Sequence, residues 1–302
     1  MENFDVIIIG GGPAGLSAAL MLGRSRRSVL IVDACHPRNE VSRAMHGFLS
    51  RDGVHPLEFL KHAREQLQHY PNVHYRVGDV TDLQATGAEF HVRCAEGAEY
   101  TALKVLIATG QRDELPQIEG LPELFGKSVF HCPYCDAWEV QDQPLAAWGR
   151  GHHGVALART LTNWSSDVVY CADGETDFSP EDRADLERYK ITVRHERIAR
   201  LEGRDGKLES VVFHEGPPLK RTALFFSTDN KLASNLAPKI GCKISDKGYV
   251  MTHDCESCDV KGLYVAGDAA GSSNLAIVAA ADGATAAIAI NTALIEQKPV
   301  TV

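Results

Sequence analysis

The first thirty-three residues alternate between apolar runs and a glycine cluster in a way that predicts a βαβ unit. Phe4 to Ile9 is a short β-rich apolar run, and Ser28 to Val32 is a second one. Between them, the glycines of Gly10–Gly15 predict a turn, and the small and apolar residues of Leu16–Leu22 predict a helix packed on a sheet. The pattern indicates parallel strands joined by a crossover helix.

The turn carries the spacing G-x-G-x-x-G at Gly10, Gly12 and Gly15, with Pro13 and Ala14 between the last two glycines. In this motif the first glycine permits the tight turn, the second lets the backbone approach a pyrophosphate, and the third lets helix and strand pack closely. Phosphates then lie at the helix N-terminus, where free N–H groups favour anions. Asp33 ends the second strand, in position to accept hydrogen bonds from a ribose diol. These features predict a dinucleotide site.

A second unit of the same kind begins near residue 144. A strand is predicted at Pro144–Trp148, a helix at Val155–Leu161 and a further strand at Asp167–Cys171. The glycines Gly149, Gly151 and Gly154 repeat the motif, and Asp173 repeats the acidic residue. The alternative is a glycine turn that binds nothing, because His152 and His153 would crowd a phosphate site.

Two further strands run directly into polar turns. Lys104–Ala108 leads into Thr109 and Gly110, and Gly262–Ala266 leads into Gly267 and Asp268. The alanine-rich stretch 275–294 predicts a buried helix rather than a membrane span, because Asp282, Gly283 and Asn291 interrupt it. Connections between domains are predicted around 113–126 and, less sharply, around 227–240.

Composition and charge narrow the class of protein. The 302 residues are 44% hydrophobic and 24% charged, as in ordinary globular proteins, and their number suggests roughly two domains. A net charge of −9 argues against nucleic-acid binding, which leaves a basic footprint. No basic, apolar leader opens the sequence, so we expect a cytoplasmic protein that binds no membrane.

Eight cysteines carry the remaining chemistry, and the pair Cys132 and Cys135 is its centre. In a reducing compartment a C-x-x-C pair is catalytic or metal-binding more often than structural. Pro133 suits an early helical position, where free N–H groups would favour the Cys132 thiolate. Asp136 could pass protons to a thiolate, and His131 could carry protons or favour the thiolate by its charge. We therefore predict a redox pair.

The alternative for this pair is half of a zinc site completed by Cys255 and Cys258, but the two pairs lie much farther apart than the roughly 15–20 residues of a zinc ribbon. We predict no metal. The second pair itself admits three interpretations: unreactive loop thiols, an auxiliary redox pair or metal ligands. The four remaining cysteines stand alone and are expected to be small buried packing residues: Cys35, Cys94, Cys171 and Cys242.

Taken together, these motifs resemble those of the low-molecular-weight thioredoxin reductases and their relatives, the flavin-dependent dithiol–disulfide oxidoreductases. The resemblance spans nearly the whole chain and rests on Gly10–Gly15 with Asp33, Ala108-Thr109-Gly110, Cys132-x-x-Cys135-Asp136, Gly149–Gly154 and Gly267-Asp268. It implies an α/β fold with two Rossmann-like dinucleotide-binding domains, in which the nicotinamide domain (116–232) is inserted into a split FAD domain (1–115 and 233–302).

The resemblance also implies roles for the motifs. Gly10–Gly15 and Asp33 would hold the adenosine half of FAD, and Asp268 would hold its pyrophosphate–ribityl side. Gly149–Gly154 would hold NADH or NADPH. Cys132 would attack the substrate while Cys135 faces the flavin, and a domain rotation would let the pair meet both. A homodimer is the family expectation.

The sequence departs from these reductases at three places. Cys171-Ala172-Asp173-Gly174 replaces a basic stretch that grips the NADPH 2′-phosphate, and an acidic residue there favours NADH or poor use of either nucleotide. Residues 272–276 replace an Arg-Gln pair near the flavin. Cys-Pro-Tyr-Cys, with Trp138-Glu139 after it, is more typical of relatives that oxidise small dithiols.

Three functions therefore stay open. The first is a reductase that passes electrons from NAD(P)H through FAD and the Cys132–Cys135 disulfide to a thioredoxin-like protein or a small-molecule disulfide. The second is a dithiol oxidase that forms substrate disulfides with oxygen as the electron acceptor. The third, which no output domain supports, is a non-catalytic flavin redox sensor.

Overall fold

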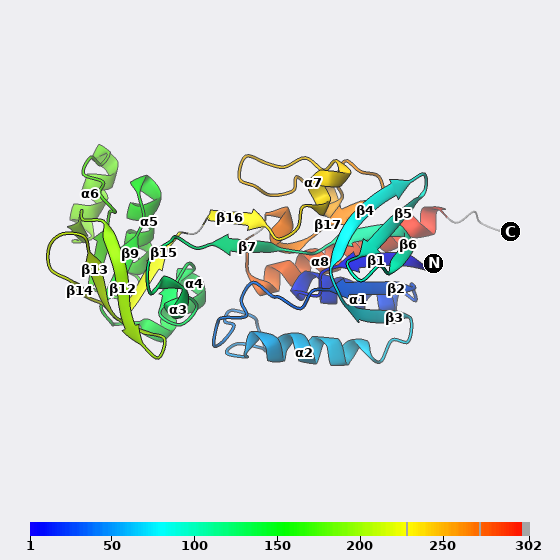
Figure 1. Ribbon diagram of the computed structural model, residues 1–302, viewed down its shortest axis with the longest axis horizontal. Coiled ribbons are helices and arrows are strands. Elements are labelled where there is room, and N and C mark those ends of the chain that lie inside the picture. Colours follow the sequence, from blue (N-terminus) through cyan, green and yellow to red (C-terminus); the bar gives the residue numbers. More distant parts are fainter. Residues whose placement is uncertain (228, 272, 298–302) are drawn as a thin grey trace.

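The chain folds into two units joined by two extended connections (Figure 1). The computed structural model describes residues 1–227, 229–271 and 273–297. Both chain ends belong to the first unit, and the middle of the chain forms the second (Figure 1).

Among the described residues, seven strands from both ends of the chain form the sheet of the first unit. They are β1 (Glu2–Ile9), β2 (Val29–Asp33), β3 (Val73–Val77), β4 (Val80–Thr86), β5 (Glu89–Cys94), β6 (Glu99–Ile107) and β17 (Leu263–Val265). Their order is β3-β2-β1-β6-β5-β4, and β17 pairs in parallel with β6, Leu263 opposite Val105. The strands β1, β2, β3, β6 and β17 run parallel, whereas β5 is antiparallel to β4 and β6.

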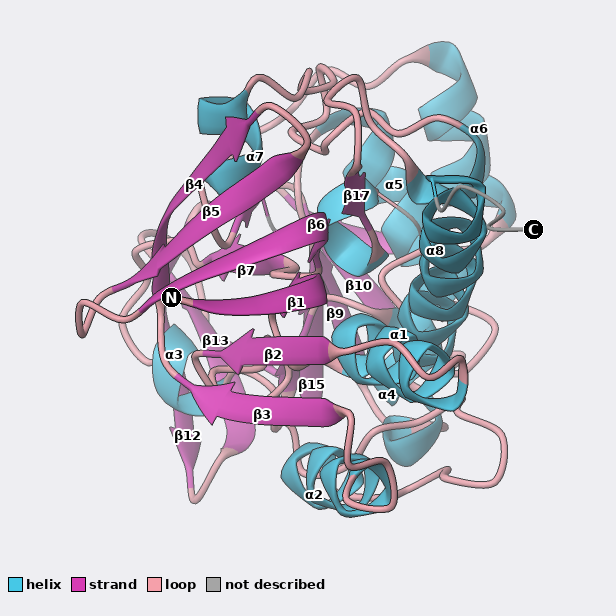
Figure 2. Ribbon diagram, turned by 90° about the vertical axis from the view of Figure 1, so that its right-hand side faces the viewer, coloured by secondary structure: helices cyan, strands magenta, loops and turns pink. Residues whose placement is uncertain are grey.

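Helices cover both faces of this sheet. On one face α1 (Pro13–Arg24) and α8 (Ala276–Gln297) lie side by side, with α2 (Pro56–Leu67) near the β3 edge (Figure 2). On the other face α7 (Leu236–Ile240) packs near β4. Each face has its own apolar core, because the buried residues of β1 and β2 point alternately to the two sides.

The helix α8 is long and apolar enough to cross a membrane, judged by length and composition alone. In the structure it packs one face on α1 and the sheet, and its buried residues are Ala279, Gly283, Ala286, Ala287, Ile290 and Leu294. A Cβ at Gly283 would lie 2.0 Å from the carbonyl oxygen of Ala14. The two helices therefore approach most closely at the first turn of α1, beside the glycine motif.

The second unit is built on five parallel strands, counted over the described residues, in the order β11-β10-β9-β15-β8. They are β8 (Val129–Phe130), β9 (Leu145–Trp148), β10 (Val168–Cys171), β11 (Thr192–Arg194) and β15 (Ala223–Phe226). An antiparallel sheet packs beside them and contains β12 (Ile198–Arg204), β13 (Lys207–Phe213) and β14 (Leu219–Lys220). The helices are α3 (Leu121–Leu124), α4 (Pro133–Asp136), α5 (Gly151–Leu161) and α6 (Pro180–Arg188).

The two connections are β7 (Gln111–Glu114) and β16 (Asp229–Leu232), which pair with each other as antiparallel strands. The chain leaves the first unit through β7, forms the second unit and returns through β16. It then completes the first sheet with β17. This is the predicted α/β fold, with one Rossmann-like unit inserted into the other. The numerical boundaries 1–115, 116–232 and 233–302 stay a prediction.

Both motif helices begin earlier than predicted. The helix α1 starts at Pro13, and α5 starts at Gly151. For α1 the reason is Pro13 itself, whose fixed φ suits the first helical position and whose missing N–H would be unpaired there anyway. Each motif glycine run is therefore shared between the turn and the first turn of the helix.

The close approach of α8 and α1 makes a prediction about Gly283. Replacing glycine by alanine inside a helix normally stabilises a protein, by up to about 1 kcal/mol. Here the new methyl group would meet the Ala14 carbonyl, so we expect Gly283→Ala to destabilise the protein by about 1–3 kcal/mol, as overpacking does. Urea unfolding measures the change. Gly283→Ala with unchanged or higher stability would contradict the packing, and the exposed Ala281→Gly is the control for helix propensity alone.

Candidate redox and dinucleotide-binding site

The first glycine motif forms a turn with one crowded side and one open side. Gly10 has a φ of +107°, and a Cβ there would lie 2.4 Å from the carbonyl oxygen of Ala108. A Cβ at Gly15 would lie 1.9 Å from the oxygen of Gly10, so the helix rests directly on the strand end. At Gly12, by contrast, no atom of the described residues lies within 4 Å of the Cβ position. This open side is where a pyrophosphate can approach the backbone.

Asp33 lies against the same turn. Its carboxylate is 2.4 Å from the Cβ position of Gly11, and it accepts hydrogen bonds from the backbone N–H of Cys35 and from the hydroxyl of Tyr75. Burial and the hydrogen bond to Asp33 raise the pKa of the Tyr75 hydroxyl, which therefore stays protonated and donates. An ionised carboxylate accepts about four hydrogen bonds, so Asp33 keeps capacity for a ribose.

The residues after Ala108-Thr109-Gly110 contribute a further polar group. Gln111 is buried, and both atoms of its side-chain amide lack a hydrogen-bond partner among the described residues. Buried polar groups are almost always paired, so an amide of this kind fits a polar ligand beside it. The open glycine turn, the ribose-type carboxylate and the unpaired amide together fit FAD in the first unit.

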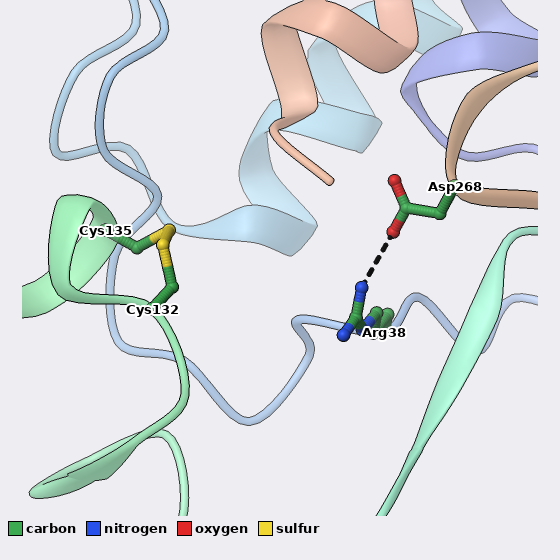
Figure 3. The surroundings of a disulfide bond; sticks show 4 residues. All are labelled: Arg38, Cys132, Cys135 and Asp268. Carbon is green, nitrogen blue, oxygen red and sulfur yellow. Dashed lines mark hydrogen bonds and ion pairs between the residues drawn. A yellow bond between two sulfur atoms is a disulfide. The ribbon is translucent and has the colours of Figure 1, made fainter. Parts of the chain in front are cut away.

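Asp268 lies in the turn that follows β17, the 3₁₀ turn Gly267–Ala270. Arg38 reaches it from the loop after β2, with 3.1 Å between Nη1 of Arg38 and Oδ2 of Asp268 (Figure 3). The same guanidinium bonds to Asp113 on β7, at 2.5 Å, and to Asn230 on β16, at 3.1 Å. Arg38 therefore connects the predicted flavin-side turn to both connections between the units.

Cys132 and Cys135 form a disulfide at the start of α4. Cys132 is the N-cap residue and Pro133 the first helical residue, and the N–H groups of Cys135 and Asp136 both point to the carbonyl of Cys132. Two large aromatic side chains beside the disulfide are exposed, Tyr134 by 77% and Trp138 by 67%. Figure 3 shows the disulfide in the same region as Arg38 and Asp268 of the first unit.

Asp136 is suited to acid–base work. Burial, and next the negative charge of Glu139, raise the pKa of its carboxyl to about 7, while His46 lowers it. At neutral pH the carboxyl is then divided between its acid and its base form, as general acid–base catalysis requires. Its proton-transfer role stays a prediction.

His131 differs from one sequence expectation. Burial lowers the pKa of its ring, against the attraction of Asp113 and Asp268, so the imidazole is neutral at pH 7. A neutral ring cannot favour a thiolate by its charge, although it can still donate or accept a proton. Its electrostatic contacts with Arg38, Asp113 and Asp268 place His131 beside the Arg38 cluster.

The loop after β2 also holds the two units together near the disulfide. Nε2 of His46 lies 3.3 Å from the carboxylate of Glu139, three residues after Asp136. Nη2 of Arg43 donates to the carbonyl of Asp205 at 3.2 Å. The first unit therefore contacts the second directly on the side that carries the redox pair.

The second glycine motif is occupied by the protein's own side chains. The N–H of Gly151, at the start of α5, donates to a carboxylate oxygen of Glu175 at 2.7 Å. Asp173 has a left-handed backbone and is ion-paired with Arg150, inside the motif, at 2.7 Å. Nδ1 of His152 bonds to Asp182 on α6 at 2.8 Å, and Gly154 packs against Tyr170. A carboxylate thus lies where the phosphates of a bound nucleotide would go.

The remaining cysteines are arranged differently from the prediction. Cys35 is exposed rather than buried, because it lies at positive φ in the loop after β2, beside Asp33 and Tyr75. Cys258 does not pair with Cys255, which is exposed in the 3₁₀ turn Asp254–Glu256. It lies against Cys242, which therefore does not stand alone. Cys94 and Cys171 are buried, as predicted.

Four residues of the site were not found from the sequence: Arg38, Tyr75, Gln111 and Glu175. Arg38 lies in a polar loop without periodicity, and its partners are 75, 192 and 230 residues away in the chain. The signal for Glu175 was present, since it follows the same strand end as Asp173. Of the departure at residues 272–276, Ser272 lies outside the described residues. Within the described residues no group of three or more metal-binding side chains occurs.

Comparison with known proteins gives a consistent result. The model of the pyridine nucleotide-disulphide oxidoreductase family matches residues 4–283. A curated protein named "Probable thioredoxin reductase", from Arthroderma benhamiae, is 31% identical over 89% of this chain and 74% of its own. The thioredoxin reductase tcpT of Claviceps purpurea is 31% identical over 87% of this chain and 86% of its own.

Solved structures show the same similarity in three dimensions. The structure of an oxidoreductase from Agrobacterium tumefaciens superposes with a TM-score of 0.92 at 33% sequence identity. The superposition covers 99% of this chain and all of that one. Both units and their relative placement are therefore shared with a known oxidoreductase.

The open side of the first motif predicts the effect of Gly12→Ala. The backbone of Gly12 has a φ of −77°, which alanine adopts freely, and the new methyl group meets no protein atom. We expect thermal stability of the apoprotein to be unchanged and flavin binding to weaken at least tenfold, because the methyl group would occupy the pyrophosphate approach. Flavin absorbance per protein after gel filtration checks it. Full flavin content would contradict this placement.

The raised pKa of Asp136 predicts a pH dependence of stability. The folded state binds this proton more tightly than the unfolded state, so Asp136 stabilises the fold less as the pH rises from about 4 through 7. Asp136→Asn cannot ionise. The free energy of unfolding of this variant, relative to that of the native protein, should therefore rise by a few kcal/mol from pH 4 to pH 8, since one pKa unit corresponds to about 1.4 kcal/mol.

Urea unfolding of the disulfide form at pH 4, 6 and 8 measures this difference, and a difference that does not change with pH would contradict it. The exchange of Cys132–Cys135 with a small dithiol should slow by roughly 10²-fold in the same variant, because the proton donor is lost.

Proposed function

This chain belongs to the pyridine nucleotide-disulphide oxidoreductase family, and from that premise we propose that it is a flavin-dependent dithiol oxidase. It is an FAD-dependent disulfide oxidoreductase of the thioredoxin reductase-like type. The proposal concerns the direction of electron flow: Cys132–Cys135 oxidises an external dithiol, and oxygen is the final electron acceptor. The single observation that carries it is the Glu175 carboxylate at the N-terminus of α5.

The carboxylate of Glu175 opposes the use of NADH and NADPH. It already accepts the hydrogen bond of the Gly151 N–H, and Asp173 adds a second acidic group held by Arg150. A nucleotide pyrophosphate would have to displace one carboxylate and lie close to another. Like charges at this separation repel, so the second motif keeps the Rossmann geometry and disfavours its usual ligand.

The residues around the disulfide supply the steps of thiol oxidation. A substrate thiolate attacks Cys132, the Cys132–Cys135 bond breaks, and Cys135 leaves as a thiolate that takes a proton from Asp136. The second substrate thiol, after losing its proton to the Asp136 carboxylate, attacks the substrate sulfur of the mixed disulfide. This releases the substrate disulfide and leaves Cys132 and Cys135 reduced.

FAD, when bound, would supply a two-electron acceptor that restores the disulfide and passes the electrons to oxygen. Gly10–Gly15, Asp33, Gln111 and Asp268 would hold it in the first unit. The assignment of Cys132 to the substrate and Cys135 to the flavin follows the family resemblance. The exposed rings of Tyr134 and Trp138 fit a substrate with apolar or aromatic surface next to its sulfurs.

A second candidate function is the reverse direction, in which NADH drives reduction of a thioredoxin-like protein or a small-molecule disulfide. The names of the curated relatives favour it. In this case Asp173 favours NADH over NADPH, because an acidic residue suits a free 2′-hydroxyl. A cytoplasmic location and a homodimer are part of both proposals.

Anaerobic reduction of the flavin-loaded protein separates the two functions. We expect a small dithiol to bleach the flavin absorbance, neither NADH nor NADPH to do so, and admitted oxygen to restore the absorbance with formation of hydrogen peroxide. Cys132→Ser should abolish bleaching by the dithiol. Rapid bleaching by NADH or NADPH at micromolar concentration would overturn the proposed direction and support the second function.

The Glu175 contact predicts a gain of function. In Glu175→Ala the Gly151 N–H is free for a phosphate, so we expect NADH-dependent bleaching to become at least tenfold faster than in the native protein. Glu181→Ala, which removes one exposed acidic residue from α6, is the matched control and should change nothing. Equal rates in all three proteins would show that Glu175 does not control nucleotide access.

A further inference from the structure

Two buried cysteines outside the redox site lie in contact with each other. The sulfur atoms of Cys242 and Cys258 are 3.2 Å apart, although the residues are separated by 16 positions in the chain. Both side chains are buried in the core below the seven-stranded sheet, at 6% and 8% exposure. None of the steps of thiol oxidation uses this pair.

The backbone on both sides of the pair is fixed. The N–H of Cys242 donates to the carbonyl of Ala237 at 2.9 Å, just after α7, and the N–H of Cys258 donates to the carbonyl of Leu263 at 3.3 Å, at the start of β17. The residues that follow the two cysteines, Lys243 and Asp259, form an ion pair at 2.9 Å. The sulfurs are therefore held together by packing, by backbone hydrogen bonds and by a salt bridge.

The electrostatics of the two thiols differ. The hydrogen bond from Cys242 lowers the pKa of Cys258 to about 7, against the effect of burial. The same hydrogen bond and burial raise the pKa of Cys242. Cys258 is thus the more acidic thiol of the pair, and near pH 7 a fraction of it is a thiolate in contact with the Cys242 sulfur. Such a pair has a nucleophile and a resolving thiol already in contact.

We propose that Cys242 and Cys258 are a second dithiol–disulfide couple, oxidised by hydrogen peroxide. The Cys258 thiolate attacks one oxygen of the peroxide, the O–O bond breaks, and hydroxide leaves, giving a sulfenic acid on Cys258. The Cys242 sulfur then attacks the Cys258 sulfur, loses its proton and displaces hydroxide, so that a disulfide forms. In total two thiols and one peroxide give one disulfide and two waters.

The disulfide would close a ring around the segment that supports the predicted flavin-side turn. Inside this ring the N–H of Val250 donates to the carbonyl of Ala269 at 2.9 Å. The ring of Tyr249 lies 2.5 Å from the Cβ position of Gly271. Asp268 directly precedes Ala269 in the turn Gly267–Ala270, so cross-linking Cys242 to Cys258 restrains the turn that carries it. Oxidation would therefore stabilise the first unit and its hold on flavin.

Peptide mapping of the flavin-loaded protein tests the couple. The reduced protein is treated with a small excess of hydrogen peroxide, its free thiols are alkylated under denaturing conditions, and the digest is analysed by mass spectrometry. We expect a peptide that links Cys242 to Cys258, formed equally well in Cys255→Ser and absent in Cys242→Ser. Full alkylation of both cysteines, or a link from either one to Cys255, would overturn the proposal.

Thermal release of flavin gives a second measurement that does not depend on comparing variants of different stability. For each protein the release midpoint of the peroxide-treated form is compared with that of the dithiol-treated form. The native protein and Cys255→Ser should show a midpoint several degrees higher when oxidised, as expected for closing a loop of this length. Cys242→Ser should show no such difference, and neither should Cys258→Ser. A shift that persists in both would assign the effect to Cys132–Cys135 and overturn the stabilising role.

This couple is independent of the direction of electron flow in the proposed function. Peroxide is added in the experiment and does not have to come from the enzyme. A linked Cys242–Cys258 peptide in a protein that NADH reduces rapidly would support the couple and reject the oxidase function. No linked peptide, in a protein that a dithiol reduces and NADH does not, would reject the couple and support the oxidase function.

Discussion

The geometry of the site depends on the interactions of the Arg38 guanidinium. One guanidinium bonds to Asp268 in the flavin-side turn, to Asp113 on β7 and to Asn230 on β16. Its side chain is only 13% exposed, so the cost of burying it must be met by these partners. Hydrogen bonds and charges of Asp113 and Asp268 outweigh the effect of burial and raise the pKa of Arg38, which remains a cation. Arg38 and Asp268 belong to the first unit, so the guanidinium ties the flavin-side turn of this unit to both connections.

This arrangement links the two tasks of the redox disulfide. In the proposed function Cys132–Cys135 exchanges with a substrate at the surface, where Tyr134 and Trp138 are exposed, and also meets the flavin on the other unit. His131 beside the Arg38 cluster and Glu139 bonded to His46 place α4 against the first unit. The structure thus represents an arrangement in which the segment that carries the disulfide contacts the first unit. Any rotation of the units, which the inserted order permits, would break these polar contacts.

The sequence predicted well the features that depend on the local conformation of the backbone. The glycine turns, both βαβ units, the inserted order and the start of α4 at Pro133 follow from steric needs of a few neighbouring residues. The chain could not show contacts between residues far apart in sequence. Arg38 finds its partners across the whole fold, and Cys258 contacts Cys242 because α7 and β17 bring them together, whereas the C-x-x-C spacing pointed to Cys255. The strands β3–β5 and β11–β14 were also not predicted, because their side chains are only partly buried.

The two glycine motifs show why a fingerprint does not by itself assign a ligand. Both have glycines at the same spacing, both open a helix after a buried strand, and both have an acidic residue after the next strand. The difference lies in the side chains that surround each motif. At the first motif nothing covers Gly12, and Asp33 keeps hydrogen-bonding capacity beside it. At the second, Glu175 accepts a hydrogen bond from the first N–H of α5, and Arg150 forms an ion pair with Asp173. Because both a protein carboxylate and a phosphate can bind the N–H groups of a helix terminus, the glycine spacing alone does not distinguish a nucleotide site from one that contacts the protein's own side chains.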